Sequence, residues 1–259
     1  MHQPPWDPVP VRRRIARRMV PRIGPDARAV DDVSFPKDGK MSVGVAPQYC
    51  GAPGKQANCQ VAVSVHADSD TASCPLNWRL FLPREWADDA VRRRRTGVPD
   101  NVGHREKWRP ALDALDELAA WHLAPPVVVA DAGYGQNADF RAGLAGRGQA
   151  YVVGIRGDIT VQPHEAHPAV PAWSGTGRRP VPRHRQPPVT VAELAAGTGR
   201  EAFSEVTWRE GSRGPMTSRF LAMPVRPAGA RSRRLAQAAA VAAHGQWGGV
   251  LPQVRMLAE

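Results

Sequence analysis

Acidic residues follow two short apolar segments that lie far apart in the sequence. Residues 127–130 are Val-Val-Val-Ala and lead into Asp131, and residues 27–30 are Ala-Arg-Ala-Val and lead into Asp31 and Asp32. Small and β-branched residues bounded by proline and glycine predict short strands. Open α/β sheets place their chemistry at the carboxyl ends of strands. Carboxylates at two such ends predict a site for a hard divalent metal ion.

Asp31 and Asp32 are neighbours on one predicted strand. Adjacent strand residues point to opposite faces of a sheet, so we expect only one of them to join Asp131. We favour Asp32 as the metal ligand, with Asp31 orienting a neighbour or the following loop. An alternative stays open, in which an aspartate only caps a turn. The turn-rich residues 34–40 should end this strand at residue 33.

Two further segments predict strands beside the first one. Residues 59–66 and 76–82 alternate apolar and polar side chains, as half-buried antiparallel strands do. Residues 42–49 are a weaker strand candidate. Together with strand 27–33, the two alternating segments should form an antiparallel meander.

Helices and parallel strands should complete this sheet. Apolar residues recur at helical spacing in 105–122, and a second helix is expected over 136–147 with Asn137 as its N-cap. Strands 127–130 and 151–155 follow the two helices. This order predicts an α/β fold, with a ribonuclease-H-like mixed sheet flanked by helices. In that layout the first strand and strand 127–130 lie side by side.

The two ends of the chain differ from this central region. Residues 1–26 should hold a short basic helix in which Val11, Ile15 and Met19 form one apolar side. We expect a catalytic core over 27–156 and, over 157–259, a proline- and arginine-rich excursion followed by a β-rich insertion or second layer. Thr190 and Glu193 fit a capping box. Further strands are expected at 202–209, 218–225 and 250–257.

The charge of the chain suggests a polyanionic partner. Its formal net charge is +11, and among its 35 basic residues the only lysines are Lys37, Lys40, Lys55 and Lys107. Arginine matches phosphate geometry, although GC-rich codon usage would also favour arginine. The run Arg92, Arg93, Arg94 and Arg95 is expected on a surface loop, either as a phosphate contact or as a solvated run.

Nothing in the sequence predicts a membrane segment or a disulfide framework. No run approaches the ~18 apolar residues of a membrane helix, and residues 1–6 do not form a signal peptide. Cys50, Cys59 and Cys74 form no C-x-x-C pair, so we expect buried thiols. These features predict a cytoplasmic protein with no membrane partner.

Several segments resemble those of insertion-sequence transposases with a DDE catalytic domain, in particular the type 701 group, which is related to type 4. They are VDDVSFPK at 30–37, SVGVA at 42–46, QYCG at 48–51, NCQV at 58–61 and VADAGYG at 129–135. The resemblance extends from about Pro5 to the end of the chain. It implies metal-dependent DNA strand cleavage and strand transfer at transposon ends.

The resemblance also implies a site and its partners. Two aspartates and one glutamate of the family bind two Mg²⁺ (or Mn²⁺) ions, which activate water or a 3′-hydroxyl and stabilise the leaving oxygen. The first aspartate corresponds best to Asp32 of the Asp31–Asp32 pair, and the second corresponds to Asp131. The implied partners are transposon-end DNA and a second copy or a full-length transposase, with association to the nucleoid.

The third acid of the family has no evident counterpart. Its helix should follow the insertion, yet nothing after Leu251 resembles it, and we expect none of the preceding glutamates to replace it: Glu165, Glu193, Glu201, Glu205 or Glu210. The family's N-terminal DNA-binding region also has no counterpart. We therefore expect a fragment truncated at both ends, which holds at most one ion and has little or no activity. The alternative is a non-catalytic DNA-binding remnant that competes with a full-length transposase.

Overall fold

A computed structural model describes residues 7–51, 53–235 and 254–255. The chain divides into two compact units, Met1–Gly154 and Ile155–Glu259, and each is described by itself. None of the described helices combines the length and apolar character that crossing a bilayer requires.

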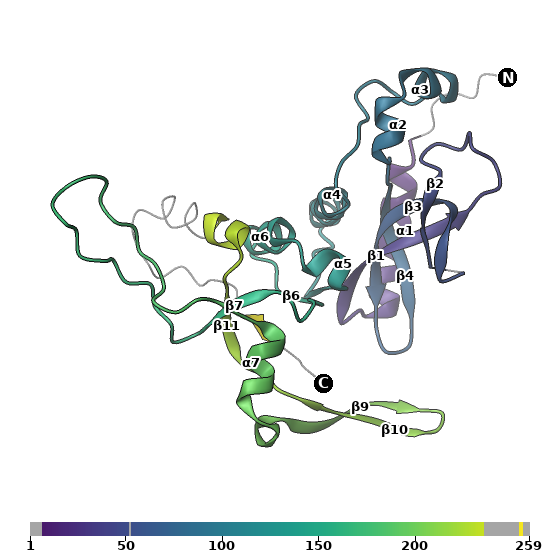
Figure 1. The fold of residues 1–259 in the computed structure, drawn as a ribbon. Coiled ribbons are helices and arrows are strands. Elements are labelled where there is room, and N and C mark those ends of the chain that lie inside the picture. The colour runs from purple at the N-terminus through teal and green to yellow at the C-terminus, as the bar shows by residue number, and fades with distance from the viewer. Residues whose placement is uncertain (1–6, 52, 236–253, 256–259) are drawn as a thin grey trace. The chain divides into compact units, whose positions relative to one another are not determined.

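The first unit is built on a mixed six-stranded sheet (Figure 1). Its strand order is β2-β3-β1-β5-β6, and β4 also pairs with β3. The strands are β1 (Ala27–Pro36), β2 (Ala46–Cys50), β3 (Lys55–Asp68), β4 (Ser73–Leu80), β5 (Val128–Ala130) and β6 (Tyr151–Val153). Strands and helices together make this a mixed α/β unit, as predicted.

The pairing of the strands brings the two acidic strand ends together. β1, β3 and β4 form the predicted antiparallel meander. β1 and β5 are parallel neighbours, with Val30 opposite Ala130, so both strands reach their acids at the same edge of the sheet. The predicted side-by-side arrangement of these two strands is therefore confirmed.

Two predictions about β1 and β3 are wrong. β1 does not end at residue 33 but continues to Pro36, because the long strand β3 offers pairing partners as far as Cys59. Pro36 is tolerated there since a proline at a strand terminus removes only one donor from the ladder. β3 is not half-buried at its centre: residues 61–65 are all buried, because the small Ala62 and Ser64 on the second face lie beside the large Leu80 and Trp78 of β4.

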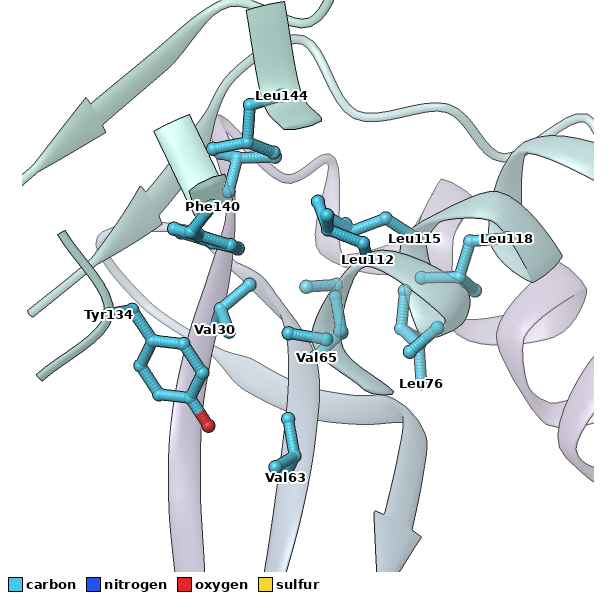
Figure 2. Close-up of a cluster of buried hydrophobic side chains, with 14 of the residues drawn as sticks. Val30, Val63, Val65, Leu76, Leu112, Leu115, Leu118, Tyr134, Phe140 and Leu144 are labelled. Carbon is cyan, nitrogen blue, oxygen red and sulfur yellow. The ribbon is translucent and has the colours of Figure 1, made fainter. Parts of the chain in front are cut away.

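Helices of the first unit supply most of its core. They are α1 (Val9–Ile23), α2 (Arg84–Asp88), α3 (Ala90–Thr96), α4 (Trp108–Ala120), α5 (Ala132–Gly135) and α6 (Ala138–Gly146). Asn137 caps α6 by accepting a hydrogen bond from the Phe140 backbone N–H, as predicted. Figure 2 shows leucines of α4 and side chains of α6 facing valines of β1 and β3. This apolar core holds the strand ends in place.

α1 packs on this core through residues other than those predicted. Val11 and Ile15 are 43% and 41% exposed, whereas Arg12 and Ala16 are buried. The buried guanidinium of Arg12 donates a hydrogen bond to Asn77 Oδ1 at 2.5 Å. The inward side also carries Val9, Val20 and Ile23, which pack against the core. It is an apolar side interrupted by Arg12, so the predicted side with Val11, Ile15 and Met19 was wrong.

The second unit is β-rich, as predicted. A four-stranded sheet has the order β12-β11-β7-β8, and β9 and β10 form a separate hairpin. Its elements are β7 (Thr160–Pro163), β8 (Val189–Thr190), α7 (Val191–Thr198), the 3-10 helix η1 (Arg200–Ala202), β9 (Ser204–Gly211), β10 (Gly214–Phe220), β11 (Pro224–Pro227) and β12 (Val254–Arg255). A small apolar cluster around Val161, Leu221 and Val225 forms its core.

The second unit contains one predicted helix cap, but its strands begin and end at other residues than predicted. Thr190 and Glu193 form the predicted capping box at the start of α7. The single strand predicted at 218–225 is instead the end of β10 and the start of β11. The only pairing within residues 164–188 is the isolated bridge between Ala169 and Arg183, so this stretch is an irregular excursion. Of the strand predicted at 250–257, only residues 254 and 255 are described.

Candidate active site

A cavity of about 600 Å³ lies where β5 ends beside the middle of β1, within the first unit. Its lining includes the three predicted acids, Asp31, Asp32 and Asp131. The cavity also contains residues that the sequence did not single out, among them His104, Glu106, Lys107 and Tyr134. The structure thus brings together acids that are a hundred residues apart in the chain.

Asp32 is held by two side chains, one at each carboxylate oxygen. The Tyr134 hydroxyl donates to Oδ1 at 2.6 Å, and the Lys107 ammonium donates to Oδ2 at 2.5 Å. The side chains of Lys107 and Asp32 are 33% and 32% exposed, so the ion pair stands at the cavity wall rather than in the core. The carboxylate is therefore oriented and partly solvated.

Tyr134 keeps its proton in this setting. Burial raises the pKa of its hydroxyl, and the negative charge of Asp32 raises that pKa further. A phenol with a raised pKa is a hydrogen-bond donor at neutral pH. Tyr134 also reaches the apolar core, where its ring lies 5.6 Å from that of Phe140 (Figure 2).

The glycine after Tyr134 allows α5 to lie against the neighbouring strand end. A Cβ atom at Gly135 would lie 2.0 Å from the backbone oxygen of Gly154 and 2.8 Å from the Cβ of Val153. No larger residue fits such a close approach of two backbones. Gly135 therefore helps to place Tyr134 at the cavity.

Asp131 begins α5 as its N-cap residue. Its Oδ1 accepts hydrogen bonds from the backbone N–H groups of Gly133 at 2.9 Å and Tyr134 at 3.3 Å. The sequence did not predict this capping role of Asp131. Both bonds end on Oδ1, so capping is compatible with ligand binding through Oδ2.

Asp31 lines the same cavity as Asp32, contrary to the expectation that only one of them would join Asp131. Its Oδ1 accepts a hydrogen bond from the Asp32 backbone N–H at 2.7 Å. Side-chain alternation decides the face of a sheet, but β5 ends opposite Val30 while β1 continues to Pro36, so both faces of β1 can border a cavity beyond the end of β5. The choice between Asp31 and Asp32 as ligand stays a prediction.

The side chains at the cavity fit a hard cation in their chemistry. Mg²⁺ is usually held by one or two carboxylates together with water and substrate phosphates. Asp32 and Asp131 provide such oxygens, whereas no three acidic, histidine or cysteine side chains of the described residues gather tightly enough to hold an ion by themselves. All five glutamates weighed as a third ligand belong to the second unit, and Glu193 is used in the capping box.

The four consecutive arginines lie on helix α3, not on the loop that was predicted. Asp89 caps this helix by accepting a hydrogen bond from the Arg92 backbone N–H. Arg92 stacks 3.6 Å from the centre of the Trp86 ring, and Arg93 donates to the backbone oxygens of Ala87 and Pro99. Arg94 and Arg95 are exposed and stay the better candidates for phosphate contacts.

The sequence contains only weak indications that Lys107, Tyr134 and Glu106 would line the cavity. Lys107 stands out only because lysine is rare in this chain, and its partner Asp32 is 75 residues away. Tyr134 lies within the glycine-bounded motif after Asp131, but no spacing rule links its hydroxyl to β1. Glu106 accepts a hydrogen bond from the Trp108 indole N–H, a contact that sequence spacing does not predict.

Comparison with known proteins identifies the family. No curated protein and no solved structure matched the chain. A family model described as "DDE superfamily endonuclease" matches residues 1–215. With most of its length covered by that match and its acids at one cavity, this chain belongs to the DDE superfamily endonuclease family.

Proposed function

We propose that this chain carries the metal-dependent DNA strand-cleavage site of a transposase, with Asp32 and Asp131 as metal ligands. The observation that carries the proposal is the parallel pairing of β1 and β5, which places both acids at one cavity. Membership of the DDE superfamily endonuclease family supports DNA as the substrate.

The residues around the proposed ligands fix their orientation. Tyr134 holds Oδ1 of Asp32, and backbone N–H groups of α5 hold Oδ1 of Asp131. A divalent ion bound there would activate an attacking oxygen and stabilise negative charge on the phosphate. Preoriented ligands reduce the cost of assembling such a site.

Finer features of the family are part of the same proposal. We assign the first unit to a ribonuclease-H-like catalytic domain and the chain to the type 701 group, acting on transposon ends. The β-rich second unit is the proposed insertion. The described residues offer two well-placed carboxylates and no tight group of three ligands, which supports binding of at most one Mg²⁺ or Mn²⁺ ion and weak cleavage by this chain alone.

The experiment measures Mn²⁺ binding and nicking of DNA that carries the transposon ends. We expect Asp32→Asn and Asp131→Asn each to weaken Mn²⁺ binding at least about tenfold, since a nearby opposite charge is worth one or more powers of ten in affinity. Asp31→Asn serves as the matched control and should have a smaller effect. Asn at position 131 preserves the helix cap, so the fold should remain intact.

Two results would change this assignment. If neither Asp32→Asn nor Asp131→Asn changes the Mn²⁺ affinity, the proposed ligands are refuted. Efficient nicking that Asp131→Asn abolishes would show that the chain alone is a competent nuclease and would refute the weak-cleavage part.

A DNA-binding protein without catalysis is the second candidate, and it would compete with a full-length transposase. The lack of a tight three-ligand group among the described residues favours it. In that case DNA binding should weaken with salt because phosphate contacts release counterions, and it should not depend on Asp32 or Asp131.

A further inference from the structure

The Lys107 ammonium lies at one of the two oxygens through which Asp32 would bind a metal ion. The ammonium nitrogen lies 2.5 Å from Oδ2, and the Tyr134 hydroxyl occupies Oδ1. We propose that Lys107 neutralises Asp32 while the site is free of metal and DNA, and moves to a phosphate of the DNA when the ion binds. This inference rests on the proposed function.

The charges around the cavity support this role. Four acids line it, Asp31, Asp32, Glu106 and Asp131, and Lys107 is the only lysine or arginine among the described lining residues. A DNA phosphate entering a cavity with this lining would meet mainly negative charge. Lys107 is therefore the side chain of the lining that can attract it.

The structure gives Lys107 the freedom to move. Its backbone oxygen accepts the Ala111 N–H at 3.2 Å, so the backbone is tied to the start of α4 while the side chain is partly exposed. The ammonium also lies 5.1 Å from the centre of the Phe81 ring, which offers a second favourable contact. Lysine suits such a shift because its charge is compact and its stem is flexible.

Competition follows from these contacts. A divalent ion at Asp32 and the Lys107 ammonium repel each other and seek the same oxygen. The ion must displace the ammonium in the absence of DNA, whereas a bound phosphate would accept it. Metal and DNA should therefore strengthen each other's binding, and this coupling should depend on Lys107.

The test measures Mn²⁺ affinity by the electron paramagnetic resonance signal of free Mn²⁺, with and without a short DNA duplex. Without DNA, Lys107→Ala should bind Mn²⁺ about tenfold more tightly than the unaltered protein. With DNA, the unaltered protein should gain more Mn²⁺ affinity than Lys107→Ala does. The matched control is Arg105→Ala, because Arg105 pairs with Asp113 and does not line the cavity. Its Mn²⁺ affinity should stay unchanged.

The outcomes separate this inference from the proposed function. Equal or weaker Mn²⁺ binding by Lys107→Ala, together with loss of binding in Asp32→Asn, would overturn the inference and leave the metal site in place. Failure of every variant to bind Mn²⁺ would overturn both. Lys107→Gln, which also lacks the charge but keeps a polar side chain, carries the same expectation if Lys107→Ala does not fold.

Discussion

Asp32 acts through its neighbours as much as through its own charge. The Tyr134 hydroxyl donates to one Asp32 oxygen and the Lys107 ammonium to the other, and the Tyr134 ring packs in the apolar core. The position of a single carboxylate thus depends on contacts from two segments that follow it by 75 and 102 residues. At this scale the sequence predicts which acids come together at the cavity but not what holds them.

Tyr134→Phe tests the contribution of the hydroxyl group. We expect the free energy of unfolding to fall by about 1 kcal/mol, because one hydrogen bond to a carboxylate is lost while the ring packing remains. Chemical denaturation measures the change. Tyr49→Phe is the control, since the Tyr49 side chain is 66% exposed, and it should be neutral. Equal losses in both variants would contradict the assigned role of the Tyr134 hydroxyl.

The elements around the sheet are joined by a polar cluster as well as by the apolar core. Asn77 on β4 accepts from Arg12 of α1 and donates to Glu117 of α4 at 2.6 Å, and Arg79 of β4 donates to Glu117 at 2.7 Å. Burial alone would raise the pKa of Glu117, but the hydrogen bonds and charges of these partners outweigh burial and lower it. The cluster therefore stabilises the ionised glutamate.

Glu117→Gln should make the stability less dependent on pH. The pKa of Glu117 in the folded protein lies below its ordinary 4.5, so its contribution is complete above about pH 4.5 and disappears as the pH falls through the folded pKa. At pH 7 we expect a loss of about 2 kcal/mol, less than for a fully buried ion pair, because the side chain is 20% exposed.

Denaturation of both proteins between pH 7 and pH 3 measures this difference, which should shrink toward acid. Asp116→Asn is the matched control, because Asp116 precedes Glu117 on α4 and its side chain pairs with Arg147 but is 51% exposed. It should change stability by no more than about 0.5 kcal/mol. A pH-independent difference for Glu117→Gln would contradict the lowered pKa.

Most helices and strands of the first unit could be predicted, but the side of a helix that faces the core could not always be. The meander of β1, β3 and β4 and the parallel neighbours β1 and β5 followed from periodicity and the succession of strands and helices. The inward side of α1 did not, because its apolar residues Val9, Ala16, Val20 and Ile23 are interrupted by Arg12, whose partner Asn77 lies on β4. The end of β1 was also missed, since it depends on the length of β3. Local sequence does not contain such long-range contacts.

As a whole molecule, the chain has two compact units with separate apolar clusters. The predicted boundary after residue 156 lies close to the observed division after Gly154, although the predicted domain roles are untested. Some strands of the second unit were expected, but the pairing order of its four-stranded sheet could not be predicted from strands of two to four residues.

The two units should unfold in separate transitions. Leu144→Ala removes a fully buried side chain from the larger apolar cluster. It should lower the free energy of unfolding of the first unit alone, by about 2–5 kcal/mol. Val225 is 2% exposed, and Val225→Ala should lower the free energy of unfolding of the second unit alone. Calorimetry with limited proteolysis identifies each transition. One shared transition that shifts in both variants would show that the units unfold together.

The scarcity of lysine gives the cavity a built-in chemical reporter. Lys37, Lys40 and Lys55 are exposed, and Lys107 alone is tied to an aspartate within the cavity. An amine-acylating reagent followed by peptide mass spectrometry would label the first three at similar rates whatever is bound. The acylation rate at Lys107 would instead follow the occupancy of Asp32, so one covalent footprint could monitor the site without any measurement of turnover.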